Sequence, residues 1–547
     1  MEEKSSSEHY DAVKSTSTQT EKSCHILGAP GIWEATHDDA QAASTHEHSL
    51  GILTALSSYK WAVFWSLLIS MSIIMEGYDT ILIGSLYAYP SYARRFGDLD
   101  PSTGQYQISA KWQSAMGSGP QVGAIIGALV NGWLIQRFGF RPAFMLGVTL
   151  MTAFCFISFF GTSVELQAIG QIFCGIPWGI FATIGPAYAS ELCPLPLRAY
   201  LTAYVNMCFA AGQIIGAGVL QSFIDRTDDW AWRIPFALQW IWIPILFTAS
   251  IFMPESPWYL VRQGRYAEAV KTASSLMSKH EKLHARQLVA LMIQTDNLER
   301  NISEGTQYWD CFKGMDLRRT EIACVTFIGQ VTCGAQFAFS ATYFFQQAGL
   351  SSDDSYKLNL GGTGIALCGT LISWFMMKRI GRRSLYLTGM VFMSMWLLII
   401  GGLAVGESNS SVKWVQSALC LVWLLTFSLT VGPVGWIVPA EVSSTRLRSK
   451  TVVLARTCYY IAQIIASLMQ PYMMNPTSWN WRGKTGFFWF GFATMTALWA
   501  FYRLPETQGR SYEELDVMFN TKVPTRKFKN YHVDVYEYDD EKDLKEV

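Results

Sequence analysis

Long apolar stretches separated by short polar segments constrain this chain more than any other feature. Twelve of them lie between residues 61 and 503, and each is about as long as the roughly 20 residues that a helix needs to cross a bilayer. Twelve runs of this length are not expected of the buried helices in a soluble protein, so we predict an all-α membrane protein with twelve transmembrane helices. The stretches lie near 61–86, 112–135, 142–161, 167–189, 200–222, 235–253, 321–347, 359–377, 384–404, 414–439, 451–473 and 486–503.

The composition agrees with a membrane protein and argues against several other classes. Only 15% of the 547 residues are charged, against about 25% in a typical soluble protein. The formal net charge of +0 offers no basic surface for a nucleic acid. The 11 cysteines show no ligand spacing, so we expect neither a disulfide framework nor a metal site. No nucleophile–base pattern is present, so we do not expect an enzyme.

Basic residues in the short loops predict the orientation of the helices. Arg137 and Arg141 follow the second span, and further Arg and Lys residues follow the fourth, eighth and tenth. Because cytosolic loops are rich in Lys and Arg, both termini are expected in the cytosol. The expected domains are a disordered cytosolic tail (1–59), a six-helix half (60–254), a partly helical cytosolic linker (255–320), a second six-helix half (321–503) and a cytosolic tail (504–547). The linker either covers the cytosolic mouth or is a solvated connection, and we favour the connection.

Three short motifs occur twice, in the same order, once in each expected half. Arg137-Phe-Gly-Phe-Arg141 recurs as Arg379-Ile-Gly-Arg-Arg383, Glu191 with Arg198 recurs as Glu441 with Arg448, and Pro254-Glu-Ser256 recurs as Pro505-Glu-Thr507. Such a repeat suggests two halves that rock about a central site. Positive-inside topology explains the Arg residues but not the paired Glu, so we expect a charge network on the inner face that latches one state. Its expected members are Arg137, Arg141, Glu191, Arg198, Glu255, Arg379, Arg382, Arg383, Glu441, Arg448, Glu506 and Arg510.

Two carboxylates lie well inside the first span. Glu76 and Asp79 are three residues apart, so they share one face of a helix. An ionisable side chain within the membrane is costly and marks a functional site by default. The alternative is a static structural hydrogen bond or a position near the outer surface. We therefore hypothesise that these carboxylates carry a proton or contact a solute.

The repeated motifs carry a resemblance to a known family. Pro186-Ala-Tyr-Ala-Ser-Glu191, Pro254-Glu-Ser-Pro257, Gly381-Arg-Arg383 and Pro505-Glu-Thr-Gln-Gly-Arg510 are similar to the signature set of the sugar porter branch of the major facilitator superfamily. Glu76-Gly-Tyr-Asp79-Thr, Gly170-Gln-Ile-Phe-Cys-Gly-Ile-Pro-Trp-Gly179 and Trp479-Asn-Trp481 resemble fungal maltose and general α-glucoside permeases. The resemblance covers about residues 60–520 and implies proton-coupled uptake of a disaccharide.

The resemblance also implies roles for single residues, and some positions depart from it. It implies that Asp79 is the proton-coupling carboxylate. Gln171 stands where many proton-coupled sugar porters carry Arg, so Arg456 in the eleventh span is our candidate cation for a span-one carboxylate; the alternative is that its side chain reaches back to the cytosolic interface. Ala124 stands where the better-known α-glucoside permeases have Glu, which leaves maltose itself open.

Amide and aromatic side chains within the spans are the candidates for binding a sugar, because sugars need many hydrogen bonds and an apolar face to stack on. Gln213 and Trp436 match sugar-contact positions by resemblance. The other candidates are Gln171, Gln330, Gln336 and Gln463. The alternative for any one amide is a hydrogen bond between helices.

The resulting hypothesis is proton-coupled symport of a sugar, such as the α-glucoside maltose, by alternating access. The alternatives are a transporter of a non-sugar small molecule, such as a secondary metabolite, and a sugar sensor. The expected partners are the solute, protons and lipid, with no cofactor beyond the proton gradient. We expect a monomer in the plasma membrane, with Asn409 as a glycosylation site if its loop is external.

Overall fold

The computed structural model describes residues 24–26, 33–35, 37–99, 104, 106–278, 281–303, 307–347, 349–406, 410–444, 447–510, 512–529 and 531. Contacts divide the chain into two units. The small unit comprises Met1–Ser66, Tyr188–Leu201 and Pro254–Ile302, and the large unit comprises Leu67–Ala187, Thr202–Met253 and Ser303–Val547. The division does not follow the six-plus-six scheme, because part of the linker and part of the N-terminal tail belong together.

Long helices occupy all twelve expected spans. Nine helical segments in the described part of the chain are long and apolar enough to cross a membrane. They are built from α4 (Lys60–Ser70) and α5 (Ser72–Leu86), α8 (Phe140–Phe160), α9 (Val164–Leu192), α11 (Trp230–Leu238) and α12 (Trp242–Phe252), α16 (Gly314–Thr332) and α17 (Ala335–Phe339), α19 (Ser352–Arg379), α20 (Arg382–Leu403), α21 (Ser410–Leu429) and α22 (Val431–Val442), and α23 (Arg448–Met474). The other three spans form α7 (Ala110–Phe138), α10 (Leu195–Ser222) and α24 (Thr485–Arg503), which carry more polar, small or interfacial aromatic residues. The prediction of an all-α membrane protein is confirmed.

Shorter elements connect these helices in both units. In the large unit they are α6 (Pro90–Phe96), the antiparallel pair β3 (Asp98–Leu99) and β4 (Tyr106–Gln107), η1 (Gln239–Ile241), η3 (Tyr308–Phe312), α18 (Ala341–Gln347), η4 (Ala404–Gly406), η5 (Arg482–Lys484), α25 (Tyr512–Asn520) and η6 (Thr525–Lys527). In the small unit they are the antiparallel pair β1 (Cys24–Ile26) and β2 (Trp33–Ala35), α2 (His37–Ser49), α3 (Ile52–Ser58), α13 (Pro257–Arg262), α14 (Tyr266–Leu276), η2 (Glu281–His284) and α15 (Ala285–Ser303).

Parts of the expected tail and linker are helical. Residues 37–49 and 52–58, within the tail that the sequence predicts to be disordered, form α2 and α3. Their polar composition hides this order, since it gives no long apolar run. Within residues 255–303, α13, α14 and α15 are helices, and α14 and α15 bury residues such as Ala269 and Val289. Residues 1–23 lie outside the described part of the chain.

Several spans are broken near their middle. The seventh span breaks at Gly334, whose φ of 93° is left-handed, a conformation that glycine adopts without strain. The tenth span breaks at Thr430, just before Pro433. In the sixth span, the 3-10 turn Gln239–Ile241 separates α11 from α12. Pro244 in α12 has no N–H for a bond to the preceding turn, which favours this local change. By contrast, α9 continues through Pro177 and Pro186.

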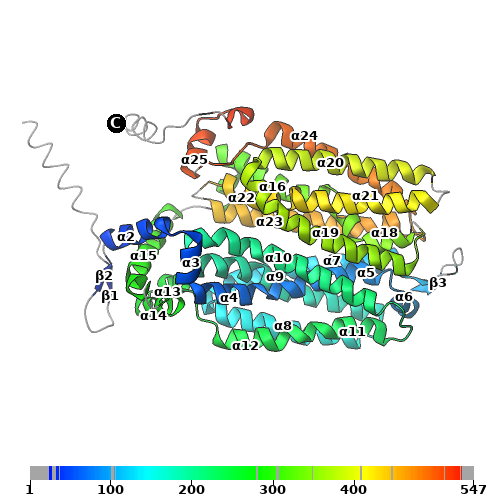
Figure 1. Ribbon diagram of the computed structural model, residues 1–547, viewed down its shortest axis with the longest axis horizontal. Helices are drawn as coiled ribbons and strands as arrows, with labels where there is room; N and C mark the ends of the chain where they lie inside the picture. Colours follow the sequence, from blue (N-terminus) through cyan, green and yellow to red (C-terminus); the bar gives the residue numbers. More distant parts are fainter. Residues whose placement is uncertain are drawn as a thin grey trace, which may run out of the picture. The chain divides into compact units, whose positions relative to one another are not determined.

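Long helices of the large unit run side by side (Figure 1), and glycines allow some of them to pack closely. A Cβ on Gly77 of α5 would lie 2.1 Å from the carbonyl oxygen of Phe209 in α10, and a Cβ on Gly212 of α10 would lie 2.1 Å from that of Ile74. Only glycine permits such an approach, as in other membrane helix pairs with small residues at the contact. The carboxylate-bearing helix α5 is therefore held directly against α10.

Hydrogen bonds join the two six-helix halves at one end of the large unit. Tyr356 Oη in α19 donates to the carbonyl of Ser85 in α5 over 2.5 Å. Asn475 Nδ2 donates to the carbonyl of Ile108 over 2.9 Å, and Ser114 Oγ in α7 donates to that of Leu468 in α23 over 2.9 Å. The loop-charge pattern predicts that this end is extracellular.

Candidate functional site

Asp79 lies in a hydrogen-bonded chain that crosses three helices. Its side chain is 1% exposed, and Gln239 Nε2 donates to its Oδ1 over 2.9 Å. The Oε1 of Gln239 in turn accepts from Cys155 Sγ over 3.2 Å. Asp79 Oδ2 is buried and has no hydrogen-bond partner among the described residues. These hydrogen bonds therefore hold one carboxylate oxygen of Asp79 and leave the other without a described partner, where it can carry a proton.

Gln239 was not predicted from the sequence. It belongs to η1, the short 3-10 turn that interrupts the sixth span. A signal was present, since a polar Gln stands between Pro235 and Pro244 in an otherwise apolar run, and prolines there break regular helix hydrogen bonding. The turn directs this amide toward a carboxylate in α5, a partner that spacing along the chain cannot reveal.

Arg456 on α23 lies in an aromatic cage. Its guanidinium carbon lies 4.0 Å from the centre of the Trp436 ring, 4.9 Å from that of Tyr460 and 5.3 Å from that of Tyr459. Nη2 donates to Tyr460 Oη over 3.1 Å, whereas Nη1 is buried and has no partner among the described residues. Cation–π contacts of this kind contribute roughly 0.5–2 kcal/mol each. The expected alternative, in which Arg456 reaches back to the interface, does not describe this geometry.

Arg456 acts electrostatically on Glu76, and no described hydrogen bond joins it to Asp79. Glu76 lies on the same helix as Asp79 and interacts electrostatically with Arg456. Asp79 takes its hydrogen bond from Gln239 instead. The two carboxylates of the first span therefore have different partners, one an amide within the same half and the other a cation from the opposite half. A pairing of Arg456 with a span-one carboxylate remains a prediction, with Glu76 as the acid on which its charge acts.

The candidate sugar-binding amides fall into two groups. Gln171 in α9 and Gln213 in α10 are buried, and Gln171 Oε1 and Gln213 Nε2 have no partner among the described residues. In contrast, Gln330 Nε2 donates to the carbonyl of Gly432 over 2.6 Å, and Gln336 Nε2 donates to Ser467 Oγ over 2.9 Å. The second pair thus links helices within the C-terminal half, which was the alternative reading of such amides.

The two remaining candidates lie on α22 and α23. Trp436 is 46% exposed, and the guanidinium of Arg456 lies over its ring. The rings of Trp436 and Phe327 form a T-shaped pair with centroids 5.3 Å apart. Gln463 is buried on α23. An aromatic ring that is half exposed beside a cation can stack against an apolar sugar face.

Equivalent motifs form equivalent clusters in the two halves. In the small unit, Glu191 accepts hydrogen bonds from Ser256 Oγ and, over 3.0 Å, from Arg262 Nη1. In the large unit, Glu441 accepts from Thr507 Oγ1 over 2.5 Å and from Arg382 Nη2 over 3.2 Å. Ser256 and Thr507 occupy the same place in the repeated Pro-Glu-Ser/Thr motif. The side chains of Arg198 and Arg448 lie outside what the structure describes.

The other inner-face candidates have varied surroundings. Glu506 Oε1 accepts the backbone N–H of Gln508 over 3.3 Å, and Glu255 Oε1 accepts that of Ser256 over 3.1 Å. Arg383 Nη2 donates to the carbonyl of Phe501 over 2.9 Å, and Arg510 Nη2 donates to that of Tyr531 over 2.6 Å. The exposed members are Arg137, Arg141 and Arg379. Asn409 lies outside the described residues.

Comparisons with known proteins agree with this architecture. The family described as "Sugar (and other) transporter" matches residues 65–519. Maltose permease MAL31 of Saccharomyces cerevisiae is 38% identical over 514 residues, which are 93% of this chain and 83% of that protein. The general alpha-glucoside permease of the same yeast is 39% identical over 505 residues, covering 91% of this chain and 82% of that protein.

Solved structures share the fold. The xylose transporter XylE from E. coli, in a partially occluded inward open conformation, matches with a TM-score of 0.67 and 20% identity, covering 82% of this chain and 99% of that one. Another structure of XylE, described as a major facilitator superfamily proton:xylose symporter, matches with a TM-score of 0.65 and 22% identity, covering 84% and 99%. With the family match over most of its length, the chain belongs to the sugar (and other) transporter family and has the fold of the major facilitator superfamily.

Proposed function

We propose that this protein takes up an α-glucoside disaccharide, such as maltose, together with a proton across the plasma membrane. The similarity to yeast maltose and alpha-glucoside permeases over more than nine-tenths of the chain supports the substrate class. The observation that carries the coupling is Asp79, a carboxylate buried in a membrane helix, with one oxygen held by Gln239 and the other without a partner in the described part of the chain. Transport, rather than chemistry on the solute, is the activity that this site supports.

Asp79 acts as the proton carrier. A protonated carboxyl can donate one hydrogen bond and is neutral, so its burial at the centre of the membrane costs far less than that of a carboxylate. Gln239 is an amide donor that bonds either form through Oδ1. A charge moved through 100 mV gains about 2.3 kcal/mol, and a tenfold proton gradient adds about 1.4 kcal/mol. Together these energies drive accumulation of a neutral sugar by several hundredfold.

The sugar binds where polar groups lack protein partners. Gln171 Oε1, Gln213 Nε2 and Arg456 Nη1 are buried atoms of that kind. Leaving such groups unbonded costs about 1–3 kcal/mol each, so a solute rich in hydroxyls is favoured there. The half-exposed Trp436 adds an apolar surface next to Arg456. Gln330 and Gln336 support the helices instead of the sugar, since their amides are bonded within the protein.

The hydrogen bonds between halves suggest which state the structure represents. They lie at the end predicted to be extracellular and include those from Tyr356 and Asn475. We infer a state that is closed toward the outside, with both termini in the cytosol. The clusters around Glu191 and Glu441 then stabilise the inner ends of the helices within each half and rearrange as access alternates.

Uptake measurements with external pH recording test the proposal. The chain is expressed in a yeast host lacking α-glucoside transport and offered labelled maltose, sucrose or glucose. We expect uptake of an α-glucoside with alkalinisation of the medium, and loss of accumulation with retained sugar exchange in Asp79→Asn. Absence of uptake for every sugar offered, despite confirmed surface expression, would refute the substrate class. Accumulation by Asp79→Asn equal to wild type would refute the coupling role.

A further inference from the structure

Two histidines and a glutamate from distant parts of the sequence meet in the small unit. His46 lies on α2, while Glu281 and His284 lie on η2. Their ligand atoms, one from each residue, all lie within 4.8 Å of one another. The two histidines line a pocket of about 550 Å³ together with Gln41, Thr45 and Gln287. None of these residues takes part in the proposed transport site.

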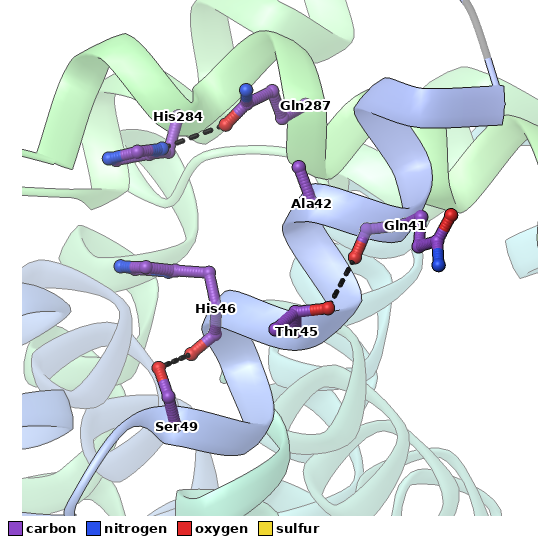
Figure 2. Close-up of a pocket in the computed structure, with 7 residues that line it drawn as sticks. All are labelled: Gln41, Ala42, Thr45, His46, Ser49, His284 and Gln287. Atoms are coloured by element: carbon purple, nitrogen blue, oxygen red, sulfur yellow. Dashed lines mark hydrogen bonds between the residues drawn. The ribbon is translucent and has the colours of Figure 1, made fainter.

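Local geometry explains the arrangement. Residues three apart in a 3-10 helix are eclipsed, so Glu281 and His284 project from the same side of η2. Figure 2 shows the ring of His46 facing the ring of His284 across the pocket. The two rings are stacked, with centroids 4.6 Å apart and planes at 16°. His46 Nε2 lies 3.7 Å from Glu281 Oε2, which is longer than a hydrogen bond.

Each of the two candidate ligands on η2 is held by a hydrogen bond to a nearby side chain. In both cases the bond uses the atom that would not bind the metal. His284 Nδ1 is 2.8 Å from Gln287 Oε1, which leaves Nε2 for coordination (Figure 2). Ser58 Oγ donates to Glu281 Oε1 over 3.2 Å, which leaves Oε2. Glu281 Oε2 is buried and makes no hydrogen bond among the described residues. Metal-binding histidines and carboxylates are held by such outer partners in known sites.

We propose that His46, Glu281 and His284 bind a zinc-class divalent cation. Two imidazoles and one carboxylate are a common ligand set for zinc, with a water in the fourth position. Calcium and magnesium prefer oxygen ligands throughout, so the histidines argue against them. Zinc bonds of about 2.0–2.1 Å in tetrahedral geometry place ligand atoms about 3.3 Å apart. Small rotations of the three side chains would close the present separations of 3.7 Å to 4.8 Å.

The bound metal would tie the N-terminal helix α2 to the linker element η2. At present the described contacts in this region include the Ser58–Glu281 hydrogen bond and a backbone hydrogen bond of 2.7 Å from Ser278 to Ser58. A metal adds a link from α2, whose described side-chain bonds at Thr45 and Ser49 stay within the helix. A bound metal would therefore strengthen the attachment of α2 to η2.

Metal titration of the purified full chain tests the site. The protein is prepared without a polyhistidine tag, and a chelator removes any bound metal. It is then titrated with Zn²⁺ against a chromophoric competitor. We expect one Zn²⁺ per chain and a loss of affinity above about 100-fold in His46→Gln, Glu281→Gln or His284→Gln, since even outer partners are worth 10–100-fold. Co²⁺ should give the visible absorption of a tetrahedral ion in wild type only.

Two controls and a second readout keep the test decisive. Gln41→Ala alters the same pocket without removing a ligand, and His532→Gln removes a histidine elsewhere; both should bind Zn²⁺ like wild type. Lys282 is exposed and lies between Glu281 and His284 in the sequence. Zn²⁺ should therefore slow tryptic cleavage after Lys282 in the wild type but not in Glu281→Gln or His284→Gln. Equal Zn²⁺ binding by wild type and the His46→Gln, His284→Gln double variant overturns the proposal, as does loss of binding in His532→Gln alone.

Discussion

Gln239 Nε2 lies 2.9 Å from Asp79 Oδ1, so an amide from the sixth span meets the buried carboxylate of the first. The resemblance to proton-coupled sugar porters implies an arginine in the fourth span, at the position that Gln171 occupies here. A neutral donor stabilises the carboxylate less than a cation would, which suits a group that must gain and lose a proton during each cycle.

Gln239→Leu should impair proton-driven accumulation. The change leaves Asp79 without its hydrogen bond, and a hydrogen bond to a charged group is worth about 1.5–3 kcal/mol. We therefore expect a fall of roughly 10–100-fold in the initial rate of energised uptake, measured in vesicles with surface expression as the reference. Gln167→Leu is the control, because the described hydrogen bonds of Gln167 Nε2 go to the carbonyls of Ser158 and Gly161, and not to Asp79 or Gln239. Equal loss in both variants would contradict a specific role for Gln239.

Gln213→Leu and Gln330→Leu should separate sugar binding from helix support. Gln213 Nε2 has no partner among the residues that the structure describes, so its removal should raise the KM by about tenfold, the effect of one lost hydrogen bond, with little change in thermal stability. Gln330 is bonded to Gly432, so its removal should lower stability by about 1–3 kcal/mol with a smaller change in KM. Initial-rate kinetics and thermal unfolding of the purified variants distinguish the two. The reverse pattern would exchange their assigned roles.

Arg456→Lys and Arg456→Gln should differ in their effects. Lysine keeps the charge that acts on Glu76 but loses planar stacking on Trp436, 4.0 Å away. We expect Lys to weaken uptake by about 2–30-fold, the range of a cation–π contact, and Gln to abolish accumulation. Arg526→Gln removes a cation–π pair with Phe501 at the end of α24, 4.5 Å away and separate from the Trp436 cage, and serves as control. Full proton-linked uptake by Arg456→Gln would reject any role of this cation in coupling.

Gly381→Ala should imitate a loss of Glu506. A Cβ at residue 381 would lie 2.0 Å from Glu506 Oε2, so the carboxylate must move away from the backbone N–H groups of Arg383 and Gln508. We expect Gly381→Ala and Glu506→Gln each to slow transport several-fold, and the double variant to add little to either, because they remove one shared interaction. Gly406→Ala, where a Cβ meets nothing within 4 Å, is the matched control. Fully additive effects would show that the two residues act separately.

Local features of the sequence account for the prediction of the spans and of the carboxylates. Apolar length determines whether a helix can cross a bilayer, and each stretch shows this by itself. Proline positions alone do not tell where a span breaks: the tenth span breaks at Thr430, ahead of Pro433, whereas α9 passes Pro177 without interruption. Packing against neighbouring helices decides such details, because freed backbone groups can be satisfied by partners that the local sequence does not contain.

The sequence by itself determined twelve apolar helices, two repeated halves and an acid in the first span, because these depend on composition and order along the chain. Only the tertiary structure decided that Asp79 is bonded to Gln239 and that Arg456 lies among aromatic rings. It also brought His46 beside Glu281 and His284, where spacing alone predicted no metal site. Hydrogen bonds and metal ligation act over a few ångströms in space, so the residues that form them can be hundreds of positions apart in sequence.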